Sequence, residues 1–227
     1  MTPDDDRDAA LFAAARDGDL AKAADALDAG ANVNAANAHK VTPLLEAAGN
    51  GHVEMARYLI GRGAEVNYEG MREGSPLMLA AFLGQLELLR LFLEAGADAN
   101  LAMPHGGETA LHMAAVAGRT AAVRMLLAAG ADPNLHAKSG VATSMFDGTV
   151  RVWGETPLHY AAAYGDEEMI RAMLLAGADR EAPNTHGETP LNYAGRHRRP
   201  RSVRDLLKSV LPQDGSDDGP MAAELGR

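Results

Sequence analysis

The fold of this chain is decided by the stretch Thr156-Pro157-Leu158-His159-Tyr160-Ala161-Ala162, followed by Gly165 and by Leu174-Leu175-Ala176-Gly177-Ala178-Asp179. A threonine, a proline, a leucine and a histidine open a helix of small residues, and a glycine stops it. A second apolar helix follows, and Gly-Ala-Asp ends that helix and leads the chain into the next loop. Such a short helix pair cannot bury its own apolar faces, so the pattern predicts further copies beside it.

The copies are present at a nearly fixed period. The opening triplet recurs as Thr42-Pro43-Leu44, Ser75-Pro76-Leu77, Thr109-Ala110-Leu111, Thr156-Pro157-Leu158 and Thr189-Pro190-Leu191, at intervals of 33, 34, 47 and 33 residues. One period before Thr42 lies a less polar version that begins at Ala9. The closing Gly-Ala recurs at Gly30, Gly63, Gly96, Gly130 and Gly177. The chain therefore contains six units.

This pattern resembles the ankyrin repeat family, whose unit has about 33 residues and the signature Thr-Pro-Leu-His-x-Ala. The resemblance covers about residues 8–210. It implies an all-α solenoid of six helix-pair units with β-hairpin fingers, one of them elongated. We expect the units at about 8–34, 35–67, 68–100, 101–134, 149–181 and 182–210, with an inserted finger at about 135–154. Residues 1–7 and 211–227 are expected to be a disordered acidic lead and a disordered acidic tail.

The 47-residue interval carries about 14 extra residues between the fourth and fifth units. Within them, residues 143–153 favour a β-hairpin, because Asp147-Gly148 is a two-residue turn signal flanked by residues that prefer strands. We expect this finger to project beyond its neighbours. The last unit has Arg198 where the other units have an inter-helix glycine, and its second helix is predicted to begin near Pro200. These departures are typical of a terminal cap.

Composition excludes several classes of function. The chain has 227 residues and a formal net charge of −10 at pH 7, so we expect it to repel nucleic acid and anionic membrane surfaces. It has no cysteine, which excludes a disulfide framework and a cysteine-based zinc site. Its start lacks the basic and apolar regions of a secretory signal, and no apolar run is long enough to span a membrane. We expect a cytoplasmic protein that is a monomer when free.

Catalytic signatures are absent from the sequence, including the phosphate-binding Gly-rich loop, His-Glu-x-x-His, Gly-x-Ser-x-Gly and the Rossmann fingerprint. Glu46 stands at a helix position that carries Leu79, Met113, Tyr160 and Tyr193 in later units. One carboxylate without an acid–base partner does not make an enzyme. We therefore predict no enzymatic activity, no catalytic residue and no cofactor.

Six of the eight histidines fall into two groups. His112 and His159 occupy the histidine of the repeat signature, and the resemblance implies that each bonds to the local turn. The finger segments carry His39, His105, His136 and His186, which could form a metal-binding ladder if the fingers stack. They are not all at matching finger positions, so we predict no metal site. Residues 214–219 lack the distal glutamate of a calcium loop.

The resemblance implies a binding surface on the concave face, made by the fingers and by the two positions that precede each inter-helix glycine. These positions are apolar in the central units and polar at the ends, which is typical of an interface with an apolar centre and a polar rim. Trp, Tyr and Arg are frequent interface anchors, and Trp153 is the only Trp of the chain. The predicted partner-binding residues are Met71, Arg72, Phe82, Leu83, His105, Val116, Met145, Phe146, Val152, Trp153, Tyr164, Arg196 and His197.

Two alternatives stay open for these residues. Phe82, Leu83 and Tyr164 could simply fill the gaps between neighbouring units. The basic run from Arg196 to Arg201 could be a solvated end cap or a contact for an anion or an acidic peptide.

The sequence thus predicts a non-enzymatic protein–protein interaction module that scaffolds or occludes another protein. One alternative is a dedicated inhibitor or immunity-type protein of a single enzyme, whose active site the long finger could enter. A secreted effector would show the same pattern, because a fold alone does not fix a function.

Overall fold

The computed structural model describes residues 3–68, 70, 74–146 and 148–209. Within these residues the chain forms twelve α-helices and one pair of β-strands. The helix pairs are α1 (Pro3–Asp17) and α2 (Leu20–Asp28), α3 (Pro43–Gly49) and α4 (Val53–Gly61), α5 (Pro76–Leu83) and α6 (Leu86–Glu94), α7 (Ala110–Val116) and α8 (Thr120–Ala128), α9 (Pro157–Tyr164) and α10 (Glu167–Leu175), and α11 (Pro190–Arg196) and α12 (Arg201–Lys208). The strands β1 (Ser139–Phe146) and β2 (Gly148–Trp153) lie between α8 and α9. The predicted all-α solenoid is confirmed.

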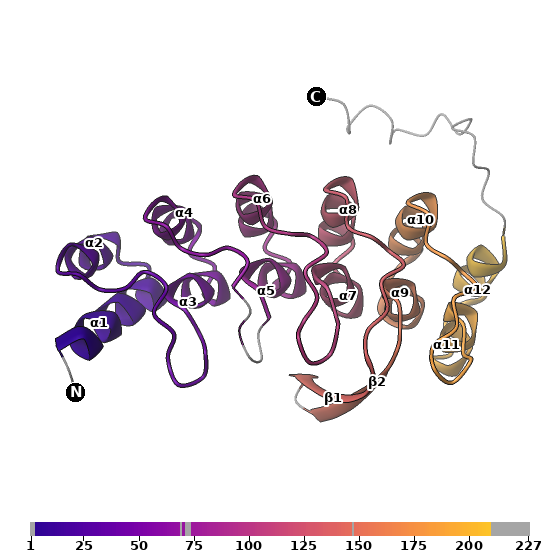
Figure 1. Cartoon of the computed structure of the whole chain (residues 1–227). Helices are drawn as coiled ribbons and strands as arrows, with labels where there is room; N and C mark the ends of the chain where they lie inside the picture. Colours follow the sequence, from indigo (N-terminus) through magenta and orange to yellow (C-terminus); the bar gives the residue numbers. More distant parts are fainter. Residues whose placement is uncertain (1–2, 69, 71–73, 147, 210–227) are drawn as a thin grey trace, which may run out of the picture.

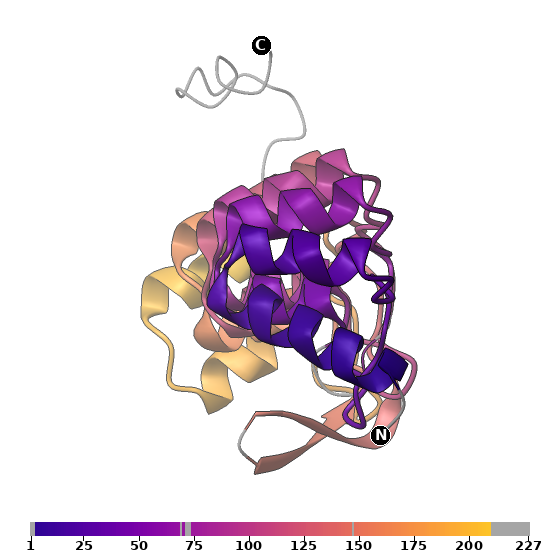
Figure 2. The ribbon, with the colours of Figure 1, turned by 90° about the vertical axis from the view of Figure 1, so that its left-hand side faces the viewer.

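The helices stand in two rows (Figure 1). The first helix of each pair forms an inner row from which the fingers descend, and the second helix forms an outer row. Neighbouring inner helices contact each other more extensively than neighbouring outer helices. We call the surface formed by the inner helices and the fingers the concave face. Viewed from the N-terminal end, the inserted finger extends below the inner helices (Figure 2).

A hydroxyl side chain marks the start of the inner helices. Thr42 Oγ1 accepts a hydrogen bond from the backbone N–H of Leu45 at 3.3 Å, and Ser75 Oγ accepts one from Met78 at 3.3 Å. In both helices a proline stands at the first helical position, where an N–H would have no partner inside the helix. The Thr/Ser-Pro-Leu triplet therefore fixes where these helices begin.

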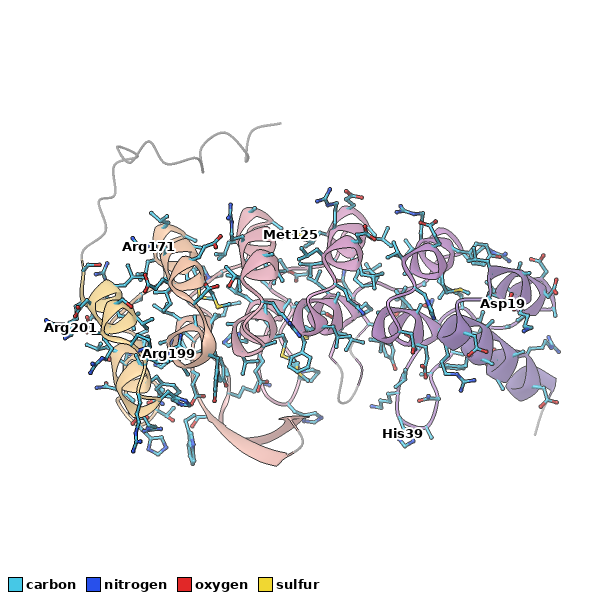
Figure 3. The ribbon with its side chains drawn as sticks, turned by 180° about the vertical axis from the view of Figure 1, so that it is seen from behind. Asp19, His39, Met125, Arg171, Arg199 and Arg201 are labelled. Atoms are coloured by element: carbon cyan, nitrogen blue, oxygen red, sulfur yellow. The ribbon has the colours of Figure 1, made fainter. Side chains whose placement is uncertain are left out.

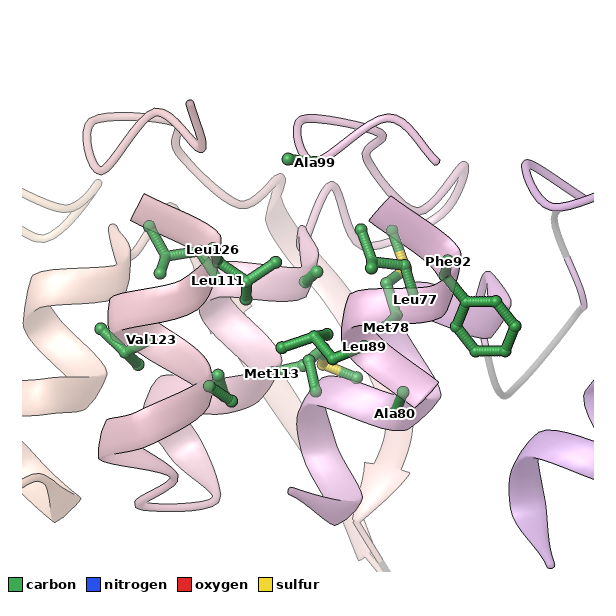
Figure 4. Packing of buried hydrophobic residues seen from close by; sticks show 14 of the residues in the cluster. Leu77, Met78, Ala80, Leu89, Phe92, Ala99, Leu111, Met113, Val123 and Leu126 are labelled. Atoms are coloured by element: carbon green, nitrogen blue, oxygen red, sulfur yellow. The ribbon is translucent and has the colours of Figure 1, made fainter. Parts of the chain in front are cut away.

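Alanine and leucine build a core that runs along the whole stack. The paired alanines of the inner helices, such as Ala47 and Ala48, are fully buried, and their small side chains let neighbouring inner helices approach closely. Larger side chains fill the space between the rows. Figure 4 shows Leu77, Leu89, Phe92, Leu111 and Leu126 of α5 to α8 in this core. Full burial of one such side chain stabilises the fold by about 1.5–3 kcal/mol.

One asparagine in each of the first four units connects that unit to the next. Its side-chain Nδ2 donates to the carbonyl of the following Gly-Ala glycine at 2.9–3.2 Å. Its Oδ1 accepts from the backbone N–H two residues beyond that glycine at 2.7–2.9 Å. We call this set the asparagine ladder, and its members are Asn34, Asn67, Asn100 and Asn134. The fourth rung joins Asn134 to Gly177 and Asp179, so it spans the insertion as the other rungs span ordinary units.

The glycines of the ladder are required by backbone conformation. Gly63, Gly96, Gly130 and Gly177 have φ between 86° and 92°, a region that side chains with a Cβ disfavour. A Cβ at any of the four would meet no atom within 4 Å. Crowding is therefore not the reason for glycine here. The left-handed turn at the glycine ends the outer helix. It leaves the carbonyl of the glycine available to accept the hydrogen bond from the asparagine amide.

The first unit begins earlier than the sequence suggested. We predicted a disordered lead over residues 1–7, but α1 starts at Pro3. The chain is held there because Arg7 Nη1 donates to the carbonyl of Ala29 at 3.0 Å and Asp8 Oδ1 accepts from the N–H of Asn32 at 2.8 Å. These two side chains bond the closing turn of the first unit, as the ladder asparagines bond the closing turns of later units. The predicted disordered tail, residues 211–227, lies outside the described residues.

The sixth unit keeps the positive-φ inter-helix turn of the first four units without their glycine. Arg198 adopts φ 53°, which costs a residue with a Cβ about 1–2 kcal/mol. Pro200 precedes the second helix, α12, as predicted.

The ladder predicts that replacing one of its asparagines lowers the stability of the fold more than is usual for an exposed residue. In Asn134→Ala two hydrogen bonds across the fourth boundary are lost, so we expect the free energy of unfolding to fall by about 1–3 kcal/mol. Urea unfolding followed by circular dichroism measures it. Asn50→Ala is the control, because among the described residues the Asn50 amide donates only to the carbonyl of Glu46 in its own unit. Equal losses in the two variants would contradict a special role for the ladder.

Candidate functional site

The inserted finger is an antiparallel hairpin of β1 and β2. Ser139 pairs with Trp153 and Ala142 with Arg151, with irregular steps near each end. The predicted hairpin is therefore confirmed, and its first strand starts earlier than residue 143. Phe146 pairs with Gly148, so Gly148 belongs to the second strand and not to a two-residue turn. Residue 147 lies outside the described residues.

Three neighbouring fingers are joined by hydrogen bonds. The backbone N–H of Lys138, at the base of the hairpin, donates to Gly106 of the preceding finger at 2.7 Å, and the ammonium group of Lys138 donates to the carbonyl of Pro104. On the other side, Ser139 Oγ donates to Thr185 Oγ1 at 3.0 Å. The long finger is thus fixed at its base to the fingers before and after it.

Trp153 is held at both of its backbone polar groups. Its N–H donates to Glu155 Oε2 at 2.6 Å, and its carbonyl accepts from the N–H and the hydroxyl of Thr185 at 2.7 and 2.8 Å. Its ring meets the His186 ring edge to face, with centroids 4.3 Å apart. A pocket of about 280 Å³ opens here, lined by Trp153, His186, Glu188 and Arg196. The structure therefore brings the predicted residues Trp153 and Arg196 to one site.

The inner helices place the other predicted residues in a row. Leu83 ends α5 and is 36% exposed, Tyr164 ends α9 and is 49% exposed, and the half-buried Val116 ends α7 between them. The Tyr164 ring lies edge-on to the exposed His197, with centroids 5.1 Å apart. Phe82 is half-buried against the core, so it contributes mainly to packing between units.

The remaining predicted residues lie on the fingers. His105 is exposed on the third finger. Met145, Phe146 and Val152 lie on the two strands of the inserted finger. Met71 and Arg72 lie outside the described residues.

His112 and His159 each connect a helix start to the next unit. The Nδ1 of His112 accepts from the backbone N–H of Thr109 at 3.1 Å, which leaves Nε2–H to donate to the carbonyl of Glu155 at 3.2 Å. His159 repeats this with Thr156 at 3.1 Å and Glu188 at 2.9 Å. Burial lowers the pKa of both histidines to about 4. They are structural, as the resemblance implied.

Sequence reasoning missed a row of glutamates at the finger bases. The signal was available, because Gly-Glu-Thr occurs at 107–109, 154–156 and 187–189. Glu155 is buried and accepts from the Tyr193 hydroxyl as well as from Trp153. Glu108 is 1% exposed, and neither of its oxygens has a hydrogen-bond partner in the described part of the chain. Burial raises the pKa of Glu108, and the neighbouring Glu155 carboxylate adds to this effect.

Neither a metal centre nor a membrane span emerges from the described residues. No three His, Cys, Asp or Glu side chains among them are placed to hold a metal ion. The finger histidines are separate, with His39 at the tip of the first finger (Figure 3) and His186 against Trp153. No helix in the described ranges is long and apolar enough to cross a membrane.

Comparison with known proteins gives matches over most of the chain. The family model described as "Ankyrin repeats (3 copies)" matches residues 69–137 and 136–215, and the one described as "Ankyrin repeats (many copies)" matches residues 11–60. Among solved structures, the chain is similar to an ankyrin repeat domain from Acinetobacter baumannii AYE, with 30% identity and a TM-score of 0.72. That match covers 87% of this chain and 95% of the other. No curated protein matches.

The buried histidines predict a loss of stability in acid. Their folded pKa lies below the ordinary value of 6.5, so the stability they contribute is complete above pH 6.5 and is lost as the pH falls towards 4. His159→Asn imitates the sixth unit, where Asn192 Oδ1 accepts from Thr189 N–H at 2.8 Å without reaching a next finger. At pH 7 we expect this variant to be about 1 kcal/mol less stable than the wild type.

The difference between wild type and His159→Asn should shrink as the pH falls from 7 to 4, as measured by urea unfolding at each pH. His39→Asn, at an exposed finger tip, controls for the removal of a histidine. A difference that stays constant over this range would show that His159 does not titrate with folding.

Proposed function

Since the chain belongs to the ankyrin repeat family, we propose that it is a non-enzymatic scaffold that holds a partner protein on its concave face. Ankyrin repeats are generally protein–protein interaction modules. The chain's own residues must supply the reason for choosing one face over another.

The observation that carries the proposal is the exposed apolar row on the inner helices. Leu83 and Tyr164 are large side chains that remain 36% and 49% exposed, and Val116 continues the row between them. Polar pairs flank it, with Arg16 and Asp17 exposed at one end of the stack and His197 at the other. An apolar centre with a polar rim is the usual anatomy of a binding surface.

The fingers offer a surface that is already ordered before a partner arrives. The backbone bonds of Trp153 to Glu155 and Thr185 hold it in place, and the base of the hairpin is bonded to the finger on each side. A preorganised surface loses little conformational entropy on binding. This favours the concave face and Trp153 as one continuous site.

One feature favours a narrower second function. The inserted finger extends below the inner helices (Figures 1 and 2), so it could enter a cleft of the partner. In that case the partner is an enzyme, and the chain is its dedicated inhibitor. Loss of the partner's activity in the purified complex would distinguish this function from scaffolding.

We expect the double variant Leu83→Ala, Tyr164→Ala to capture the partner at least about tenfold more weakly than the wild type, since truncated interface anchors cost about 2 kcal/mol or more. The measurement is a pull-down with the wild-type chain, identification of the stoichiometric partner, and titration of that purified partner against each variant.

The matched control for this titration is Leu175→Ala. Leu175 is 60% exposed at the end of the outer helix α10, so the variant removes a comparable apolar side chain from outside the concave face. Circular dichroism should be the same for all three proteins. Equal binding by the double variant and the wild type would move the site away from the concave face.

A further inference from the structure

Charge is distributed unevenly over this acidic chain. Exposed carboxylates lie on the outer helices and on the connecting turns, for example Glu87, Glu94, Glu167, Asp98 and Asp132. The finger side differs. Its described glutamates Glu108 and Glu155 are buried, and Glu188 is half-buried and paired with Arg196.

The exposed charges of the described finger residues are positive. Lys40 and Lys138 are exposed on the fingers, and Arg196 and Arg198 are exposed beside them at the end of α11. Within the described part of the chain, neither Lys138 nor Arg198 has a carboxylate within ion-pair distance. The concave face therefore presents a positive edge at the fourth to sixth units, although the whole chain carries a charge of −10.

The pocket beside Trp153 lies at this edge. Arg196 uses only Nη2 to hold Glu188 among the described residues, and a guanidinium has further N–H donors for a second carboxylate. Trp153 lines the same pocket and supplies an apolar ring beside these donors. Lys138 lies at the base of the same hairpin, where its ammonium group donates to the carbonyl of Pro104 on the preceding finger. It therefore adds positive charge to the finger side without lining the pocket.

The lining of the pocket suits a protein side chain as the occupant. Its volume of about 280 Å³ lies at the lower end of the range of about 300–1,000 Å³ that is usual for binding pockets. One apolar side chain with a neighbouring carboxylate fits a pocket with one aromatic wall and one guanidinium. Further acidic residues of an extended segment would be attracted by the positive charge of Lys138 on the neighbouring finger.

We propose that this pocket binds an extended, acidic segment of the partner, with a carboxylate on Arg196 and an adjacent apolar side chain against Trp153. The inference rests on the proposed function, because it names the chemistry of the partner at the end of the concave face. It also assigns a role to the basic run at 196–201.

The test uses the intrinsic fluorescence of Trp153, the only tryptophan of the chain, and short peptides without tryptophan. In one peptide aspartate alternates with leucine, and in its counterpart lysine replaces each aspartate. We expect the acidic peptide to change the Trp153 emission in a saturable way, with an affinity that falls as salt is added. The lysine peptide should leave the emission unchanged.

Variants distinguish recognition of the peptide's charge from non-specific binding. Arg196→Gln should weaken binding of the acidic peptide about tenfold, since a hydrogen bond between charged groups is lost, and Lys138→Gln should weaken it less. The control is Arg171→Gln, an equal change of charge on the outer helix α10 (Figure 3), which should bind within about twofold of the wild type.

Three results would overturn the proposal. The first is equal binding of the lysine peptide, and the second is equal binding by Arg196→Gln and Arg171→Gln. The third is a change in the Trp153 emission of the free chain when Asp214, Asp217 and Asp218 are all replaced by Asn, because the site would then belong to the chain's own tail. Any of these results would leave the proposed function standing if Leu83→Ala, Tyr164→Ala still loses the partner.

Discussion

The structure depends on one asparagine amide in each of the first four units, which bonds to the backbone of the next unit. Apolar burial drives the units together, but contacts between alanine and leucine are not directional and would tolerate sliding. The amide accepts one N–H and donates to one carbonyl at a fixed place, so it sets the position of each unit relative to the next. The rung from Asn134 to Gly177 has the same geometry as the others. The stack therefore continues past the insertion without a change in spacing.

This regular spacing is what creates the candidate site. Because the units are stacked in register, their fingers lie beside one another and can share hydrogen bonds, as Lys138 does with Pro104 and as Trp153 does with Thr185. The same registration aligns the ends of the inner helices, so that Leu83, Val116 and Tyr164 form one row. The buried groups at the finger bases, including His112, His159 and Glu155, use their polar atoms within and between units. On the concave face, an apolar row with positive charge at one end remains exposed.

Sequence alone was sufficient for the fold, because the Thr-Pro-Leu and Gly-Ala signatures carry their own physical reasons: a capping hydroxyl, a proline at the first helical position and a glycine with positive φ. It also located the hairpin and Trp153. It missed the ladder, although Asn34, Asn67, Asn100 and Asn134 repeat at 33, 33 and 34 residues, because a polar residue in a loop has no periodic apolar pattern to mark it. It placed the start of α1 too late, since the bonds of Arg7 and Asp8 are to residues more than 20 positions away. The pocket between Trp153 and Arg196 depends on how two neighbouring units meet, which no local pattern contains.

The most direct test of this view is the free energy of unfolding of a chain in which residues 141–152 are replaced by a two-residue Gly-Gly turn. Asn134 and the base of the finger remain intact in this variant, including the bond from Ala137 N–H to the carbonyl of Glu155. If the ladder carries the stack across the insertion, urea unfolding will stay a single transition, with a free energy within about 1 kcal/mol of the wild type. Two separate transitions, or a loss of several kcal/mol, would show that the hairpin itself holds the fourth and fifth units together.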